Sequence, residues 1–387
     1  MKKLIALLLL LIISAVIITA GCITPQETTA DETLKGDWTT QKLIKYSSET
    51  GFSEEIDEGC DVLKITEQNG RLLKMEIEGA NRIYYAAVSD KNGKAIFTDS
   101  SYGSANERLN GNILSENEII FASARYDTET KEYSVLFDVR TKDGAEIKKP
   151  DEKKEEKSLI GSYTKAWGYM FEKGGFIPRD GKTVLKITEQ NGPVFIGTIT
   201  PEGKEPQSLA GVITSVDDKG VNALIVQSDG DICNIRISDE FLSLWNVDGS
   251  RIVMFANDAV DILLTKPELN TDLAGKWICT KASSLNSDGY SVYDSDISVV
   301  IEVKEGNALL ADVSSGSKYR GKTTPFGRIS LSGISADRTI NYCIEGYISD
   351  DGKLYTYTTS KVIETGSVIQ VTESIYTKSA SKASGLA

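Results

Sequence analysis

The chain has 387 residues and a formal net charge of −13, because 56 aspartates and glutamates outnumber 43 lysines and arginines. This acidic balance opposes a nucleic-acid partner, whose binding depends on phosphate neutralisation. The sequence contains no histidine, which excludes Ser-His-Asp and Cys-His catalytic groups and His-ligated catalytic zinc. The cysteines form no CxxC pair and the acidic turns lack calcium-loop spacing, so we expect neither a metal ion nor a cofactor.

The first 22 residues have the layout of a secretory signal. Two lysines precede a continuous apolar run over residues 4–18, and Thr-Ala-Gly-Cys follows, ending at Cys22. This tetrapeptide resembles a lipobox, in which small residues precede the cysteine that receives the lipid, although its first position is more commonly aliphatic than threonine. The resemblance implies a bacterial or archaeal lipoprotein lipidated at Cys22. An uncleaved membrane anchor and an ordinary cleaved signal remain alternatives.

Each of these outcomes places the rest of the chain outside the cytoplasm. We therefore expect an extracytoplasmic protein anchored to the outer face of the cell membrane, with the membrane as one partner through the N-terminal lipid or the uncleaved anchor. Residues 23–33 are polar and contain a proline and several threonines. This composition is typical of a flexible spacer between the membrane and the first domain.

An internal repeat organises the rest of the chain. The string LKITEQNG occurs at residues 63–70 and again at residues 185–192, and residues 299–306 keep the same frame with a glycine at the turn. Each copy opens on a glycine followed two residues later by an aromatic residue, and each closes on a Thr-Lys pair. The aromatic residues are Trp38, Tyr163 and Trp277, and the closing lysines are Lys142, Lys266 and Lys378.

The three copies each span about 105 positions, which is the size of a whole domain rather than of a solenoid repeat. We predict three domains over residues 34–145, 159–266 and 273–378. A charged, proline-containing linker over residues 146–158 separates the first two, and a short linker over residues 267–272 separates the last two. Residues 379–387 are small and polar, which is typical of a frayed tail.

Each copy reads as a series of short β-strands. In the first copy Leu63 and Ile65 alternate with Lys64 and Thr66, the pattern of a half-buried strand. The following Asn-Gly pair favours a type I′ hairpin turn. Similar alternating runs recur at the spacing of an antiparallel sandwich or barrel. We predict an all-β chain of three tandem small antiparallel up-and-down barrels, each with about eight strands.

One segment of the second copy is unusually aromatic. Four aromatic residues surround a Gly-Gly pair between the first strand and the central hairpin. A loop of this composition is a place where a rigid scaffold presents a binding surface. The alternative is an extended strand buried in the core. The predicted ligand-contact residues are Trp167, Tyr169, Phe171 and Phe176.

Two further sets of residues occupy matching repeat positions. The opening aromatic residues of the three copies are predicted to plug the bottom of each barrel rather than to stack against a sugar. Glu67 and Glu189 fall on the same strand face as the apolar residues before them. Such carboxylates either line a barrel interior or reach water at the end of the strand, and a valine, Val303, stands there in the third copy.

Cysteine usage leaves one disulfide open. Only the third domain contains two cysteines, Cys279 and Cys343. An oxidising compartment permits a bridge between them, and free buried thiols are the alternative.

The Gly-x-aromatic opening, the length and the ITEQNG hairpin resemble the lipocalin and avidin type of up-and-down barrel. They also resemble surface proteins of archaea and bacteria that carry an ITEQ-G repeat on that plan. The resemblance implies small-ligand binding in the cup of the barrel, without any family residue set that transfers to these positions.

We predict a non-enzymatic binding or adhesion module whose partner is a small molecule, a glycan or a surface protein. One alternative is a carboxylate-dependent hydrolase acting on surface glycans, which needs two acidic side chains about 5–10 Å apart in one cleft. The other is a purely structural component of the cell surface.

Overall fold

The computed structural model describes residues 34–55, 62–78, 82–102, 105–143, 145, 158–261, 264, 268–323 and 328–379. These residues all fall within one compact unit. In these ranges the alternating segments form 27 β-strands and two short 3-10 helices, η1 (Thr271–Leu273) and η2 (Glu305–Asn307). None of the helices in the described ranges has the length and apolar character needed to cross a membrane.

The strands form three sheets, which we call barrels 1, 2 and 3. Barrel 1 consists of β1 (Gly36–Ser47), β2 (Gly51–Glu55), β3 (Val62–Asn69), β4 (Leu72–Ile77), β5 (Arg82–Val88), β6 (Ala95–Tyr102), β7 (Ala105–Ser115), β8 (Glu118–Asp127) and β9 (Tyr133–Lys142). Barrel 2 consists of β10 (Gly161–Glu172), β11 (Gly175–Pro178), β12 (Thr183–Asn191), β13 (Val194–Pro201), β14 (Gln207–Asp217), β15 (Gly220–Gln227), β16 (Ile232–Ile237), β17 (Phe241–Asn246) and β18 (Arg251–Asn257). Barrel 3 consists of β19 (Gly275–Asn286), β20 (Gly289–Tyr293), β21 (Ser298–Lys304), β22 (Ala308–Val313), β23 (Lys318–Thr323), β24 (Arg328–Ile334), β25 (Ile340–Ile348), β26 (Leu354–Val362) and β27 (Val368–Lys378).

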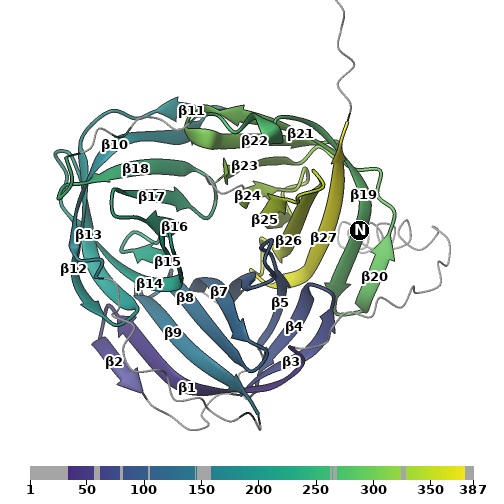
Figure 1. Ribbon diagram of the computed structural model, residues 1–387, viewed down its shortest axis with the longest axis horizontal. Helices are drawn as coiled ribbons and strands as arrows, with labels where there is room; N and C mark the ends of the chain where they lie inside the picture. The colour runs from purple at the N-terminus through teal and green to yellow at the C-terminus, as the bar shows by residue number, and fades with distance from the viewer. Residues whose placement is uncertain are drawn as a thin grey trace, which may run out of the picture. The chain divides into compact units, whose positions relative to one another are not determined.

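Each sheet is antiparallel and closes on itself (Figure 1). Neighbouring strands are consecutive in sequence apart from the second strand, and the first strand also pairs with the last: β1 with β9, β10 with β18 and β19 with β27. The second strand folds back on the far half of the first strand, which leaves eight strands in the closed ring. The predicted fold of three tandem eight-stranded antiparallel barrels is confirmed.

The repeated ITEQNG string contains a β-bulge that the sequence pattern did not reveal. The register of β3 with β4 shifts between Ile65 and Glu67, and that of β12 with β13 shifts between Ile187 and Glu189. An extra residue at a bulge reverses the facing of the residues after it. The glutamine after each glutamate therefore turns inward, and the interpretation that places Glu67 and Glu189 on the apolar face is wrong. Glu67 instead accepts a hydrogen bond from Asn69 at 2.8 Å.

In barrels 1 and 2 the inward glutamine forms a hydrogen bond with the segment that precedes the first strand. Gln68 accepts a hydrogen bond from the backbone N–H of Leu34 at 3.0 Å, and Gln190 accepts one from Leu159 at 2.8 Å. Each glutamine also donates to the carbonyl of the turn glycine two residues later. In barrel 3 Asn307 accepts from the N–H of Asn270 at 2.8 Å. The ITEQNG string of barrels 1 and 2 therefore holds the entering segment against the hairpin turn at the barrel bottom. We call this set of hydrogen bonds the clamp.

The opening aromatic residues plug the barrel cores. Trp38, Tyr163 and Trp277 are 0%, 4% and 1% exposed and belong to the three core clusters. The indole N–H of Trp38 donates to the carbonyl of Leu34, and that of Trp277 donates to Leu273, both at 2.9 Å. The prediction that these residues are structural plugs agrees with this burial.

In barrels 1 and 3 the opening glycine and the closing lysine both lie next to the tryptophan. Lys142 and Lys378 place their ammonium groups 5.9 Å and 5.4 Å from the ring centroids of Trp38 and Trp277, which is within the range of a cation–π contact. Gly36 has a φ of +136°, and a Cβ there would lie 2.9 Å from Cε of Lys142. Glycine at this position therefore leaves room for the lysine stem.

Barrel 2 departs from this scheme at its last strand. Asn257 of β18 pairs with Tyr163, the register position that Lys142 and Lys378 occupy opposite the two tryptophans. The Thr265-Lys266 pair, which the repeat pattern aligns with the closing lysines, follows the end of β18 and lies outside the described residues. That alignment is wrong, because the register places Asn257 opposite the aromatic residue of this copy.

Apolar clusters also join the outer surfaces of the barrels. One cluster packs Ala122, Ala124 and Val135 of barrel 1 against β13, β14 and β15 of barrel 2. A second packs β4, β5 and β6 of barrel 1 against β19, β25, β26 and β27 of barrel 3. A third joins barrels 2 and 3 through Trp167, Tyr169 and Ala308. Each barrel therefore contacts both of the others.

We expect Gln190→Ala to lower the free energy of unfolding by about 1–3 kcal/mol, because it leaves the buried N–H of Leu159 without its acceptor. Urea-induced unfolding followed by tryptophan fluorescence measures this change. Glu189→Ala is the matched control, since Glu189 is the exposed neighbour on the same strand. Equal destabilisation by both substitutions would contradict the clamp.

Candidate functional site: the cup of barrel 3

The three barrels share a frame but differ in the side chains that fill it. Strand alternation places every second residue of the last strand inside, counted back from the position opposite the aromatic plug. The first inward positions are Arg140, Phe255 and Tyr376; the next are Asp138, Val253 and Ser374; the third are Leu136, Arg251 and Thr372. At the first two of these positions barrel 1 is charged and barrel 2 is apolar, whereas barrel 3 carries hydroxyl groups at all three.

Barrel 1 fills its interior with an ion pair. Nε of Arg140 lies 2.6 Å from Oδ2 of Asp138, and Arg140 also donates to the carbonyl of Trp38 at 3.3 Å. Both charged side chains are buried. A buried ion pair with such hydrogen bonds is stable as long as both partners are present.

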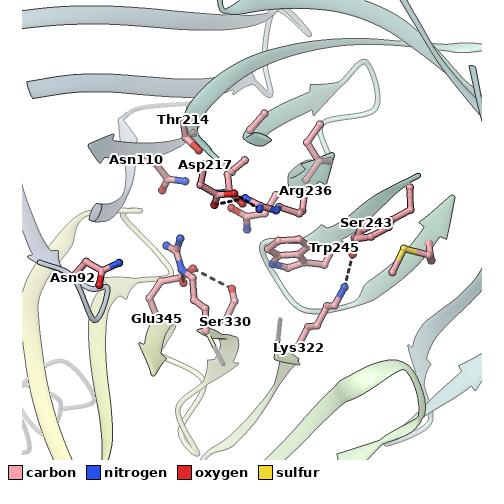
Figure 2. Close-up of a pocket in the computed structure, with 17 residues that line it drawn as sticks. Asn92, Asn110, Thr214, Asp217, Arg236, Ser243, Trp245, Lys322, Ser330 and Glu345 are labelled. Atoms are coloured by element: carbon pink, nitrogen blue, oxygen red, sulfur yellow. Dashed lines mark hydrogen bonds and ion pairs between the residues drawn. The ribbon is translucent and has the colours of Figure 1, made fainter. Parts of the chain in front are cut away.

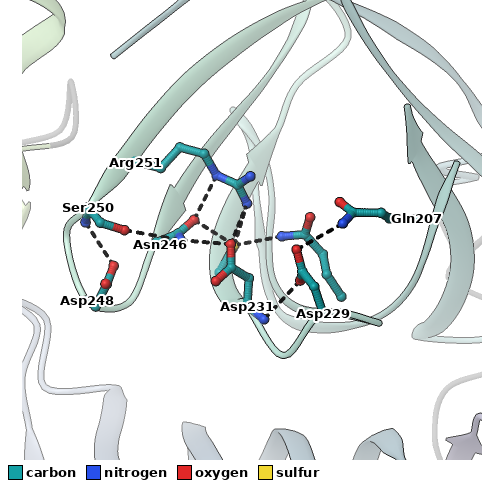
Figure 3. A network of polar contacts seen from close by, with 9 residues as sticks. Gln207, Asp229, Asp231, Asn246, Asp248, Ser250 and Arg251 are labelled. Atoms are coloured by element: carbon teal, nitrogen blue, oxygen red, sulfur yellow. Dashed lines mark hydrogen bonds and ion pairs between the residues drawn. The ribbon is translucent and has the colours of Figure 1, made fainter. Parts of the chain in front are cut away.

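Barrel 2 carries a polar network above its apolar core (Figure 3). Arg251 lies 3.2 Å from the carboxylate of Asp231 and donates to the amide oxygen of Asn246 at 3.0 Å. The thiol of Cys233, which belongs to the core cluster, donates to the same oxygen at 3.1 Å. Burial raises the pKa of Cys233 to about 12, so this side chain stays a protonated thiol at neutral pH.

Barrel 3 contains a cavity of about 280 Å³ at the corresponding level. None of the described residues that line it is charged. Its floor is aliphatic and its upper wall carries hydroxyl groups. The hydroxyl-bearing lining residues are Tyr293, Ser295, Ser315, Ser317, Tyr319, Tyr342, Thr356, Thr358, Ser360, Thr372, Ser374 and Tyr376. We call this cavity the cup.

The cup exists because small or neutral side chains replace the charged pair of barrel 1. Tyr376 and Ser374 stand where barrel 1 has Arg140 and Asp138. Two residues of the lining, Tyr293 and Ile297, are 38% and 39% exposed. The cup therefore opens to solvent beside the end of β20.

The tyrosines of the cup are hydrogen-bonding groups that remain neutral. Tyr319 and Tyr342 meet edge to face, with ring centroids 5.8 Å apart. Burial raises the pKa of Tyr319 and of Tyr342, and it raises the pKa of Tyr376 to about 12. Each phenol is therefore able to donate and to accept a hydrogen bond at neutral pH. The arrangement suits an uncharged guest that has an apolar face and several polar atoms.

The aromatic residues that the sequence singled out lie elsewhere. They stand on strands β10 and β11, so the prediction of a loop is wrong. Trp167 and Tyr169 are 9% and 3% exposed and face barrel 3, where the Tyr169 hydroxyl donates to Glu305 at 2.6 Å. Phe171 packs edge to face on Phe176, at 5.5 Å between ring centroids. A ligand-contact role for these four residues stays a prediction.

Of the two alternatives left open for Cys279 and Cys343, the structure shows the free buried thiols rather than the disulfide. Cys279 donates to the carbonyl of Lys281 at 3.4 Å, whereas Sγ of Cys343 lies 2.8 Å from Nη1 of Arg108 in barrel 1. Cys343 belongs to the cluster between barrels 1 and 3, on the outer face of the barrel wall. The predicted lipidation residue, Cys22, lies outside the described residues.

Within the described ranges no group of three or more Cys, Asp or Glu side chains could hold a metal ion. The cup residues themselves were missed by sequence reasoning. Their signal was the alternation of hydroxyl side chains at residues 372, 374 and 376 of β27, where the first copy has charged residues at the last two of these positions.

Comparisons with known proteins yield only weak structural similarities. No protein-family model and no curated protein matches the chain. A solved protein of unknown function from the DUF3598 family of Nostoc punctiforme is 11% identical, covers 90% of this chain and 97% of its own, and has a TM-score of 0.21. A mutant of the vaccine antigen Transferrin Binding Protein B from Haemophilus parasuis is 10% identical, covers 89% of this chain and 76% of its own, and has a TM-score of 0.20. At these TM-scores neither likeness carries a functional argument.

We expect the free energy of unfolding to fall as the pH rises from about 10 to about 12. The folded state holds the Tyr376 proton more tightly than the unfolded state, whose tyrosine pKa is 10.0, so folding is favoured less as that proton is lost. Urea unfolding across this range measures the slope. Tyr376→Phe should make the slope shallower, and an unchanged slope would contradict the burial of this phenol.

Proposed function

We propose that the chain is a non-enzymatic binding protein that takes a small neutral molecule into the cup of barrel 3. The observation that supports this most is the uncharged, hydroxyl-lined cavity in barrel 3, at positions where barrel 1 carries an ion pair and barrel 2 carries apolar side chains and an arginine. Ligand pockets are typically concave and mostly apolar, with a few polar groups that fix orientation. The cup is concave and partly aliphatic, and it carries more hydroxyl groups than such pockets usually do.

The size and chemistry of the cup limit the ligand class. A volume of about 280 Å³ is at the small end of ligand cavities, which begin at roughly 300 Å³. A charged guest would lose its hydration without finding a counter-charge in the described lining. The best candidate is a molecule of monosaccharide size with an apolar face and several hydroxyl or carbonyl groups, such as a methyl glycoside.

We also propose that this binding protein works outside the cytoplasm at the outer face of the cell membrane. The support is the sequence of residues 1–22, with its two lysines, apolar run and lipobox-like end. Lipidation of Cys22 would hold the protein at the membrane, and the polar residues 23–33 would separate the barrels from it. An acidic chain is held better by a covalent lipid than by attraction to anionic lipids.

The hydrolase alternative receives less support. The described lining of the cup contains no carboxylate. Asp217 and Glu345 line a different cavity, where each is bonded to an arginine. The hydrogen bonds from Arg236 lower the pKa of Asp217, which is opposite to what a general acid requires. A purely structural role is supported less than binding because barrel 3 has room for a guest.

The test is a titration of the full-length chain with methyl glucoside, glucuronate and glucosamine, followed by thermal unfolding. Binding to the folded state raises the melting temperature in proportion to the logarithm of ligand concentration above Kd. We expect the neutral glycoside to raise it more than either charged analogue.

Two variants locate the effect. Ser374→Trp places a large ring in the cup and should abolish the shift. Thr280→Trp is the matched control, because Thr280 is exposed on the outer face of the same barrel. A flat response of the wild-type chain to neutral sugars and to other neutral small molecules would favour the structural alternative.

A further inference from the structure

A second cavity, of about 240 Å³, lies where the three barrels meet. Barrel 1 contributes Asn110, barrel 2 contributes Arg236 and Trp245, and barrel 3 contributes Lys322 and Glu345 (Figure 2). We call it the junction cavity. It is separate from the cup, which lies inside barrel 3, and its chemistry is different.

Lys322 is the unusual group in this cavity. Its side chain is 4% exposed. Its ammonium group donates to the hydroxyl of Ser243 and lies 5.1 Å from the ring centroid of Trp245. Neither partner is a carboxylate, although a buried ammonium group normally has one. Burial accordingly lowers the pKa of Lys322 to about 7.

Two further donors face the same cavity without an acceptor. Nε1 of Trp245 and Nδ2 of Asn234 have no hydrogen-bond partner among the described residues, and these side chains are 7% and 8% exposed. A buried donor left unpaired costs about 1–3 kcal/mol. One acceptor, Oδ1 of Asn110, is also unbonded. The cavity thus presents more unmet donors than acceptors.

The charges around the cavity favour a single negative charge on a guest. The described lining holds three cationic side chains, Arg236, Lys322 and Arg328, and two carboxylates, Asp217 and Glu345. The carboxylates are engaged: Asp217 with Arg236 at 2.5 Å, and Glu345 with Arg108 and Arg328, both at 2.9 Å. A dianion would be repelled by the two carboxylates. A monoanion at Lys322 would make the number of negative charges equal to that of the three positive ones in the lining.

Part of the cavity wall is apolar. Phe241 and Met254 line it beside Trp245, and uncharged polar residues such as Thr214 and Ser330 line the rest. An inorganic anion would leave the apolar side chains of the cavity in contact with water, whereas an organic guest would bury them.

We propose that the junction cavity binds a small organic monocarboxylate, whose carboxylate accepts hydrogen bonds from Lys322 and Trp245 while its apolar body packs against Met254 and Phe241. The bound carboxylate stabilises the ammonium form of Lys322, so binding at alkaline pH takes up a proton. Because the cavity is built from all three barrels, the guest also strengthens their contact. This site does not rest on the proposed function of the cup.

Benzoate is the probe, and benzamide is its neutral isostere. Calorimetric titration of the full-length chain at about pH 6 should show saturable benzoate binding and much weaker benzamide binding. At about pH 8.5 benzoate affinity should be about thirtyfold lower than at pH 6, since the pKa of Lys322 is about 7 and part of the binding energy then goes to protonation. The other charged groups that face Lys322, namely Asp217, Arg236, Arg328 and Glu345, are held in ion pairs.

Variants separate the junction cavity from other sites. Lys322→Met keeps the length of the side chain without its charge and should lower benzoate affinity by about ten- to a hundredfold. Trp245→Phe removes one donor and should weaken binding by a smaller factor, which keeps the proposal testable if the first variant folds poorly. Thr280→Trp, on the exposed outer face of barrel 3, should bind benzoate as the wild-type chain does.

Three results would overturn the proposal. The first is no saturable benzoate binding, which means that water alone fills the cavity. The second is equal affinity for benzoate and benzamide, which removes the role of charge. The third is unchanged benzoate affinity in Lys322→Met. Failure of the cup to bind neutral sugars would leave each of these results unaffected.

Discussion

The pairing of the first strand with the last in each repeat is the constraint on which the rest of the structure depends. A ring closed in this way has no free edge apart from that of the short second strand, and every residue of its wall faces either inward or outward. The same pairing sets Trp38 opposite Lys142 and Trp277 opposite Lys378. In barrels 1 and 3 the glycine, tryptophan and lysine of the repeat therefore form one contact, assembled from the two ends of the copy.

Closure also explains how the copies diverged without losing the fold. The wall is held by backbone hydrogen bonds, which do not depend on side-chain identity, so inward positions above the plug are able to change together. The pair Asp138–Arg140 in barrel 1 is replaced by Ser374 and Tyr376 in barrel 3. Replacing only one member would leave a buried charge without its partner. The change to two neutral residues avoids that cost and opens space.

Local patterns predicted the strands, the hairpin and the plugs because alternation and turn chemistry depend on neighbouring residues. They failed where a single register shift intervened. The bulge after Ile65 turns Gln68 inward in place of Glu67, and no apolar alternation signals an inserted residue. By sequence the Thr265-Lys266 pair aligned with the closing Thr-Lys pairs of the other two copies. The strand register instead places Asn257 opposite the aromatic plug of barrel 2. The cup was missed since it is visible only when the copies are aligned by their pairing with the plug.

The junction cavity was beyond sequence reasoning for a different reason. Its residues lie on outward faces, where polar side chains such as Lys322 and Asn234 read as ordinary solvent contacts. They become buried because the barrel walls pack against one another, as where Lys322 of barrel 3 contacts Ser243 and Trp245 of barrel 2. A lysine that would cost nothing on an isolated barrel becomes costly once the three barrels pack together. The packing of three convex walls leaves a gap between them, and the polar groups that line this gap are satisfied by a guest better than by further packing.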